Sequence, residues 1–298
     1  MTTQAKTRPR TIAFSRKAHT QGEGAGATVH RTIGTQGLNH VDPFLLLDEF
    51  ELMPGTWAGF PDHPHRGFET VTYMLSGQIE HRDTAGNSGL IGPGDIQWMT
   101  AGSGLVHSEM PKGNQPVRGM QLWVNLPASH KMIQPRYQDI ACKDIPVAAD
   151  EGFQAVVIAG ELSGEKASVV GPVKHIVAQP IYLDVTMTGP KMQLPVPEKH
   201  RVFVYVLDGE LSIGGKSLVR RELGVLTEGA LLEIEDKSAE GTQSRFIVVG
   251  AKPVDEPISR YGPFVMSSRQ EIMDTIDEWN RGEFPGHPAQ IAKAKAGL

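Results

Sequence analysis

Short runs of strand-forming residues, each followed by a turn sequence, restrict the fold of this chain more than any other feature. Turn residues such as Ser76-Gly77 and the Gly-Pro-Gly-Asp sequence at 92–95 separate the runs. The predicted strands are residues 70–75, 78–82, 89–91, 97–100 and 121–126. Such runs, bounded by glycine and proline, are typical of β-strands rather than of long helices. The pattern predicts an all-β fold, either a barrel or a jelly roll of two sheets.

The same strand–turn–strand pattern occurs twice. Three landmarks recur 132 residues later, with Tyr73, Leu75 and Gly77 matched by Tyr205, Leu207 and Gly209. A repeat of this length indicates two similar domains rather than a solenoid of short units. A chain of 298 residues is also long enough for two domains. We therefore expect tandem β-barrels in domains 1–145 and 146–298, and we assign Tyr73, Leu75 and Trp123 to the core of the first.

The C-terminal tail has the sequence of a short helix instead. Ser268 and Glu271 have the spacing of a capping box, in which each side chain bonds the other residue's backbone N–H. Ile272, Ile276 and Trp279 then fall on one helical face. We expect this helix to pack against the second barrel.

Four side chains in the first copy have the spacing and chemistry of a metal site. His63 and His65 are two residues apart, as are His107 and Glu109, and residues i and i+2 of a strand share a face. Neighbouring strands would bring together three imidazole nitrogens and one carboxylate oxygen. This set suits a first-row divalent ion, with Fe(II) the natural candidate and Mn, Co, Ni or Cu also accepted. It contains no thiolate, which argues against a structural zinc site.

The second copy lacks these side chains. Carrying the four positions forward by the offset of the repeat leads to Pro195, Pro197, Thr242 and Ser244. None of these can replace an imidazole or a carboxylate as a metal ligand. We therefore expect the first barrel to bind a metal and the second barrel to bind none.

Composition excludes several other classes of protein. The net charge is −5 and no long basic run occurs, so direct binding to nucleic acid has little support. No stretch is long and apolar enough to span a membrane, and the first residues lack the apolar core of a signal peptide. Cys142 is the single cysteine, which fits a reducing compartment. We expect a cytoplasmic protein, or a nuclear one if the source is eukaryotic.

Beyond the lead-in, the chain resembles the pirin family of the cupin superfamily. The segments that carry the resemblance are residues 63–73, 92–102, 107–110 and 261–266. It implies two tandem cupin (jelly-roll) barrels, with one metal ion, usually iron, in the N-terminal barrel. The ligands it implies are His63, His65, His107 and Glu109. In generic cupins the glutamate of the first motif, here Glu69, is a ligand, but the pirin pattern makes it a neighbouring group instead.

The resemblance implies two classes of function. Several pirins are described as quercetin 2,3-dioxygenases, which implies a metal-dependent enzyme that opens a flavonol ring with O2, with Glu109 as proton acceptor. Other pirins are described as transcription cofactors or as regulators of metabolic enzymes. This alternative implies an iron-dependent regulatory protein that binds a protein partner. Both functions need the metal site, so the motif does not separate them.

We predict that each chain binds one metal ion, in the first barrel. The four-ligand set of the first copy and its loss in the second are the reason. Metal analysis of the purified protein should give one ion per chain at saturation, and two ions per chain would contradict the asymmetry between the copies.

Overall fold

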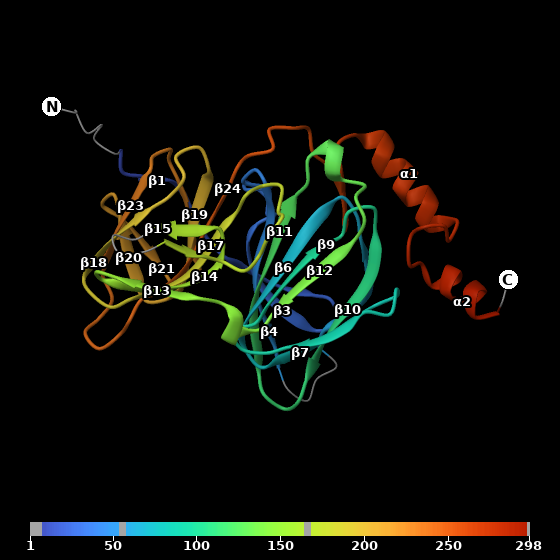
Figure 1. The fold of residues 1–298 in the computed structure, drawn as a ribbon, viewed down its shortest axis with the longest axis horizontal. Helices are drawn as coiled ribbons and strands as arrows, with labels where there is room; N and C mark the ends of the chain where they lie inside the picture. Colours follow the sequence, from blue (N-terminus) through green and yellow to red (C-terminus); the bar gives the residue numbers. More distant parts are fainter. Residues whose placement is uncertain (1–7, 54–57, 164–167, 297–298) are drawn as a thin grey trace. The chain divides into compact units, whose positions relative to one another are not determined.

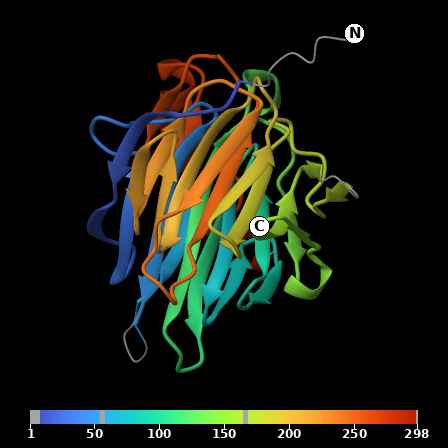
Figure 2. The same ribbon diagram turned by 90° about the vertical axis from the view of Figure 1, so that its left-hand side faces the viewer.

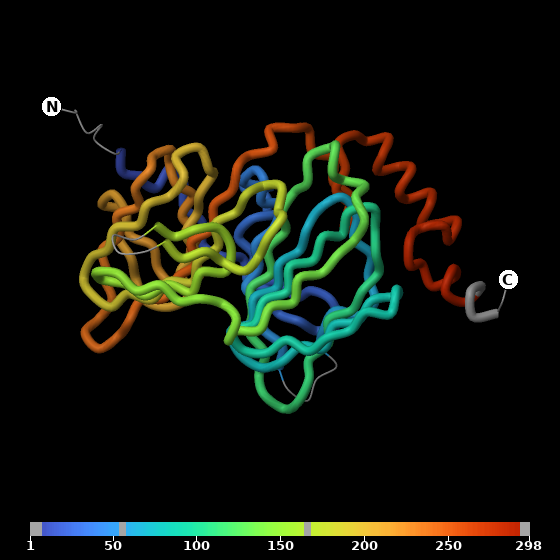
Figure 3. Tube along the Cα trace, viewed as in Figure 1, coloured from blue at the N-terminus to red at the C-terminus, as the bar shows by residue number. Residues whose placement is uncertain are grey.

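The computed structural model describes residues 8–53, 58–163 and 168–296, and β-strands make up most of it. Figures 1 and 3 show two sets of strands, with helices near the C-terminal end of the chain. The helices are α1 (Arg269–Asn280) and α2 (Pro288–Ala296), and short 3₁₀ turns occur at Ala128–His130 and Cys142–Asp144. The all-β prediction is confirmed. No helix in these described ranges is long and apolar enough to cross a membrane.

The chain divides into two compact units, and each unit includes the end of the chain that follows or precedes the other unit in the sequence. The N-terminal barrel unit consists of His19–Cys142 and Val254–Leu298, and the C-terminal barrel unit of Met1–Ala18 and Lys143–Pro253. The central boundary lies close to the one predicted at residue 145. The two chain ends differ from that prediction, because each end packs with the barrel that lies farther away in the sequence.

The N-terminal barrel unit contains two sheets of the jelly-roll kind. The larger has the order β12-β9-β6-β11-β4-β3-β2, and the smaller has the order β5-β10-β7-β8. Their bounds are β2 (His19–Glu23), β3 (Ala27–Ile33), β4 (Phe44–Leu52), β5 (Phe60–His65), β6 (Phe68–Ser76), β7 (Gln78–Asp83), β8 (Ser88–Ile91), β9 (Ile96–Thr100), β10 (Leu105–Lys112), β11 (Val117–Asn125) and β12 (Arg136–Ile140). All five strands predicted from the sequence are present.

The C-terminal barrel unit repeats this arrangement. Its larger sheet has the order β1-β22-β19-β24-β17-β14-β13, its smaller sheet has the order β18-β23-β20-β21, and Figure 2 shows the strands of this half of the chain. The bounds are β1 (Ile12–Lys17), β13 (Val147–Asp150), β14 (Phe153–Ala159), β17 (Ile181–Met187), β18 (Lys191–Pro195), β19 (Arg201–Asp208), β20 (Glu210–Ile213), β21 (Lys216–Val219), β22 (Glu222–Leu226), β23 (Leu231–Asp236) and β24 (Arg245–Ala251). A small hairpin of β15 (Glu161–Ser163) and β16 (Ser168–Val170) accompanies them.

The sheet orders explain why the N-terminal segment belongs to the C-terminal barrel unit. Tyr73 lies in β6 and its repeat partner Tyr205 in β19, so β9-β6-β11 corresponds to β22-β19-β24. In the first unit β12 covers the open edge of β9. The corresponding edge of β22 is covered by β1, which pairs with it in antiparallel fashion. An uncovered edge leaves backbone N–H and C=O groups unpaired, so the N-terminal strand completes the second sheet.

The C-terminal tail packs on the N-terminal barrel unit, and the expected packing of the helix on the second barrel is wrong. The tail forms the hairpin of β25 (Ser259–Tyr261) and β26 (Phe264–Met266), followed by α1. The predicted capping box is present, since Ser268 Oγ accepts from the Glu271 N–H and the Glu271 carboxylate accepts from the Ser268 N–H. Ile272 packs in a cluster with Val106 of β10, and Phe264, Met266 and Phe284 complete that cluster.

Arg10 fixes the N-terminal segment to the C-terminal barrel unit. Its side chain is 2% exposed and donates hydrogen bonds to the carbonyls of Thr227, Pro197, Glu198 and His200 at 2.8–3.1 Å. Replacing this side chain leaves buried carbonyls unpaired as well as losing its packing.

We predict that Arg10→Ala lowers the free energy of unfolding by about 2–4 kcal/mol. Denaturant unfolding measures this loss. Arg8→Ala is the matched control, because Arg8 is exposed, and it should change stability by less than about 0.5 kcal/mol. Equal stability of the two variants would show that the Arg10 hydrogen bonds do not hold the segment in place.

Candidate metal centre

Three histidines come together on two paired strands of the N-terminal barrel unit. His63 and His65 lie on β5 and His107 on β10, and the antiparallel register sets His107 directly opposite His63. The ring centroids are 4.7 Å apart for His63 and His65, 4.5 Å for His63 and His107, and 5.1 Å for His65 and His107. Each ring offers a nitrogen within 4.8 Å of the others. Strand alternation and pairing thus bring together the three predicted imidazole ligands.

The ring nitrogens are arranged for binding an ion. Nδ1 of His63 hydrogen-bonds the Pro61 carbonyl at 2.8 Å, which orients the ring and leaves Nε2 available. Both ring nitrogens of His107 and Nδ1 of His65 are buried and have no hydrogen-bond partner among the described residues. Burying such groups without a partner costs about 1–3 kcal/mol each. A divalent metal ion would satisfy one nitrogen of each ring, so the residues present fit the ion that the motifs predict.

Burial also keeps two of the imidazoles in the form that binds metals. Desolvation, followed by the neighbouring histidines, lowers the pKa of His65 and of His107 well below the ordinary value of 6.5. Neutral imidazole is the metal-binding form, since its ring nitrogen keeps the lone pair. The two side chains are therefore ready to bind an ion at neutral pH.

Glu109 lies on the same strand as His107, but outside the three-histidine group. It lines a cavity that His63 and His65 also line. A bulge between His107 and Glu109 changes the register against β5. The Glu109 Oε1 atom accepts a hydrogen bond from Thr72 Oγ1 at 3.0 Å. Burial raises the pKa of Glu109, against the lowering effects of His63, Thr72 and His81. Its role as the fourth ligand stays a prediction.

Glu69 faces a different environment. Its Oε1 atom accepts a hydrogen bond from Thr100 Oγ1 at 2.7 Å, and burial raises its pKa. The neighbouring Phe68 points the other way, with its ring 5.2 Å from the His65 ring. Because alternate strand residues face opposite sides, Glu69 is directed away from the histidines.

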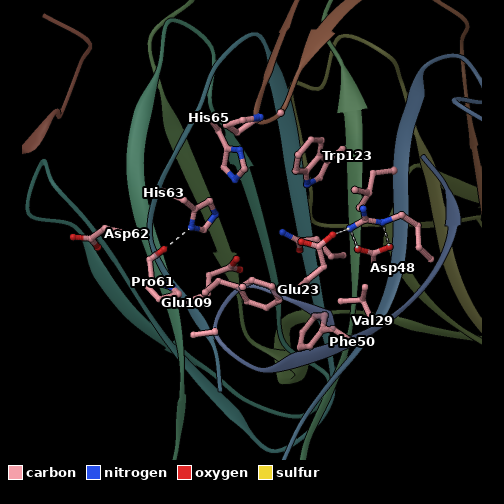
Figure 4. Close-up of a pocket in the computed structure, with 18 of the residues that line it drawn as sticks. Glu23, Val29, Asp48, Phe50, Pro61, Asp62, His63, His65, Glu109 and Trp123 are labelled. Atoms are coloured by element: carbon pink, nitrogen blue, oxygen red, sulfur yellow. Dashed lines mark hydrogen bonds and ion pairs between the residues drawn. The ribbon is translucent and has the colours of Figure 1, made fainter. Parts of the chain in front are cut away.

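A cavity of about 610 Å³ adjoins His63, His65 and Glu109. Figure 4 shows these three side chains on one side of the cavity, with Trp123 and Asp48 across from them. Much of its wall is apolar, formed by side chains that include Val29, Leu46, Phe50, Phe60 and Ile79. Trp123 therefore lines the cavity, whereas the sequence had placed it in the core; Tyr73 is buried as predicted.

Sequence reasoning missed the charged side of this cavity. Arg31 donates two hydrogen bonds to Asp48, at 2.8 and 2.7 Å, and pairs with Glu23 at 3.0 Å. Arg260 comes from the C-terminal hairpin, and its guanidinium lies 4.7 Å from the Trp123 ring centroid. These residues are far apart in sequence and belong to no motif, so only the fold could place them beside the histidines.

Among the described residues of the C-terminal barrel unit there is no comparable group. Within the part of the chain that the structure describes, the three histidines are the one set of three or more ligating side chains close enough to hold an ion. At the equivalent position, Ser244 Oγ instead donates a hydrogen bond to Asp236 at 2.9 Å. The absence of a metal from the second barrel stays a prediction.

The metal-free protein should lose stability as the pH falls below 6.5. The unfolded chain then protonates His65 and His107 at their ordinary pKa of 6.5, while the folded chain keeps them neutral. The unfolded state binds more protons, so the free energy of unfolding falls by up to about 1.4 kcal/mol per pH unit for each histidine. Urea unfolding at a series of pH values measures the slope, which should be smaller in His107→Ala. An equal slope would contradict the burial of a neutral His107.

Comparison with known proteins gives the family. The family described as Pirin matches residues 26–124, and the Pirin C-terminal cupin domain matches residues 182–285. The chain is 44% identical to a pirin-like protein of Solanum lycopersicum, covering 93% of each, and 39% identical to Pirin of Homo sapiens, covering 96% of this chain and 98% of that one. A structure named quercetin 2,3-dioxygenase from Acinetobacter baumannii superposes with a TM-score of 0.84 at 34% identity, over 93% of this chain and 99% of that one. This chain belongs to the pirin family.

Proposed function

We propose that this protein is a metal-dependent dioxygenase that opens the ring of quercetin-type flavonols with O2. The observation that carries the proposal is the group of three histidines, two of them buried and His63 half-buried, beside a largely apolar cavity that His63 and His65 line. The similar structure from Acinetobacter baumannii, which is named quercetin 2,3-dioxygenase, supports this reaction and substrate class.

His63, His65 and His107 would hold the metal ion, with Glu109 as the fourth ligand. Three neutral nitrogens and one carboxylate suit Fe(II), and also Mn, Co, Ni or Cu. When bound, such an ion supplies Lewis acidity and a template that orients the flavonol and O2. His65 and His107 are buried, which keeps bulk water away from these two rings.

Glu109 accepts the proton of the flavonol 3-hydroxyl in this proposal. Burial raises the pKa of its carboxyl group, which makes it a better proton acceptor than an exposed carboxylate. The hydroxyl of Thr72 holds Oε1, so Oε2 is the oxygen available for the proton. The Thr72 hydroxyl thus orients the carboxylate, and burial makes it more basic.

The cavity suits a planar aromatic substrate. Its volume of about 610 Å³ lies within the 300–1,000 Å³ or so that is common for small-molecule sites. Phe50, Phe60 and Trp123 present ring surfaces on which a flavonol can pack. The polar Gln121 and Arg31 can bond the hydroxyl groups of such a substrate.

We predict that Glu109→Gln lowers turnover of quercetin by about 10²–10⁴-fold, because the variant loses the proton acceptor. Oxygen consumption should be measured with the metal content of all variants matched. Glu69→Gln is the control, since Glu69 bonds Thr100 and faces away from the histidines, and it should keep most of the activity. Near-normal turnover by Glu109→Gln would remove the proton-acceptor role.

The metal content of the same variants tests the ligand set. If Glu69→Gln loses the metal while Glu109→Gln keeps it, Glu69 is the fourth ligand. If the metal-loaded natural protein consumes no oxygen with quercetin or other enolic substrates, the enzymatic proposal fails. The iron-dependent regulatory role, with a protein partner, then becomes the better explanation of the site.

A further inference from the structure

The C-terminal segment contacts both strands that carry the predicted metal ligands. We call residues 259–287, which contain β25, β26 and α1, the C-terminal strap. The strap belongs to the same compact unit as the histidines. Figure 1 shows α1 beside the strands of this unit.

Arg66, which directly follows the ligand His65, makes the first set of contacts with the strap. Its Nη2 atom donates to Glu278 Oε2 at 2.6 Å, and its Nη1 atom donates to Thr275 Oγ1 at 3.2 Å, so both contacts reach α1. Its guanidinium also lies 4.5 Å from the centre of the Phe284 ring. The residue after a ligand is therefore fixed by the strap.

The backbone around Arg66 is tied to the strap as well. The Arg66 N–H donates to the Pro263 carbonyl at 3.3 Å, and the Val265 N–H donates to the Arg66 carbonyl at 3.0 Å. Lys131 Nζ is buried and donates to the carbonyls of Gly67 and Val265 at 2.9 and 3.0 Å. The loop that leaves β5 directly after His65 is thus hydrogen-bonded to the strap at Pro263 and Val265.

The strap also contacts the second ligand strand. Val106 precedes His107 and is buried in one cluster with Phe264, Ile272 and Phe284 of the strap. Gly104 lies against the Phe284 ring so closely that a Cβ atom there would collide with it. Arg66 Nε donates to the Ser103 carbonyl at 2.8 Å. This hydrogen bond joins the loop that follows β5 to the loop that precedes β10.

Charge makes the strap contact costly to lose. Arg66 is 3% exposed, and burying a guanidinium is unfavourable unless a carboxylate balances its charge. Glu278 provides that carboxylate, and its side chain is 35% exposed at the surface of the strap. Undocking of the strap would remove the contacts of the guanidinium with Glu278, Thr275 and Phe284, so the loop that directly follows His65 would no longer be held in place.

We propose that strap docking and metal binding are energetically coupled, with Arg66 as the positioning residue that links Glu278 of α1 to His65. The docked strap holds the β5 and β10 ligands at the spacing that an ion needs, so release of the strap weakens metal binding. By reciprocity, a bound ion strengthens docking of the strap by the same factor. The inference rests on the metal site of the proposed function, and extends it to the helix α1, which does not carry any of the predicted ligands.

Co(II) affinity of the full-length, metal-free protein tests the coupling. Glu278→Gln removes the charge that balances Arg66, and we expect Co(II) binding about 3- to 10-fold weaker in a chelator competition, with an altered Co(II) visible spectrum. Glu283→Gln is the matched control, because Glu283 lies on the same segment but pairs with Arg281. It should bind Co(II) as tightly as the natural protein. Equal affinity of Glu278→Gln and the natural protein would overturn the proposal.

Hydrogen exchange in the natural protein provides a second test that needs no variant. The amides of α1 should exchange more slowly when Co(II) is bound, whereas those of β24 in the other unit should not change. Equal exchange of α1 with and without Co(II) would also overturn the coupling. If the natural protein binds no Co(II), or if His107→Ala binds it equally well, the metal site of the proposed function fails instead.

Discussion

The antiparallel pairing of β5 with β10 is the constraint on which the rest of the site depends. It sets His63 opposite His107 and, through strand alternation, brings His65 to the same face. The rings of His65 and His107 are buried, which keeps them neutral and leaves Nδ1 of His65 and both ring nitrogens of His107 without a partner among the described residues. Strand pairing therefore sets the geometry of the group, and burial sets its protonation state and its need for an ion.

The two barrel units share one arrangement of sheets but differ in the chain end that each includes. Both contain a seven-stranded and a four-stranded sheet in matching order. The second sheet takes its edge strand, β1, from the start of the chain, and the first unit takes the strap from the end. As a result, the unit that carries the predicted metal ligands includes residues that precede segment 143–253 in the sequence and residues that follow it.

Cavity and strap both contact the site, and Arg260 of the strap lines the cavity itself. Apolar walls and the Arg31–Asp48 pair surround the space where a substrate would lie. Arg66 and Val106 connect the ligand strands to α1. A buried arginine that needs a carboxylate on the strap gives a physical reason for metal affinity to depend on a distant helix.

The sequence by itself determined what depends on local pattern. Alternation and turns predicted the strands, the offset of 132 predicted two similar barrels, and the spacing of His63, His65 and His107 predicted the imidazole group. The tertiary structure alone decided which barrel receives β1 and α1, that Trp123 faces the cavity, and that Glu109 lies outside the three-histidine group. These outcomes depend on which distant surfaces bury one another and complete each other's hydrogen bonds, and no short-range period in a sequence encodes that choice.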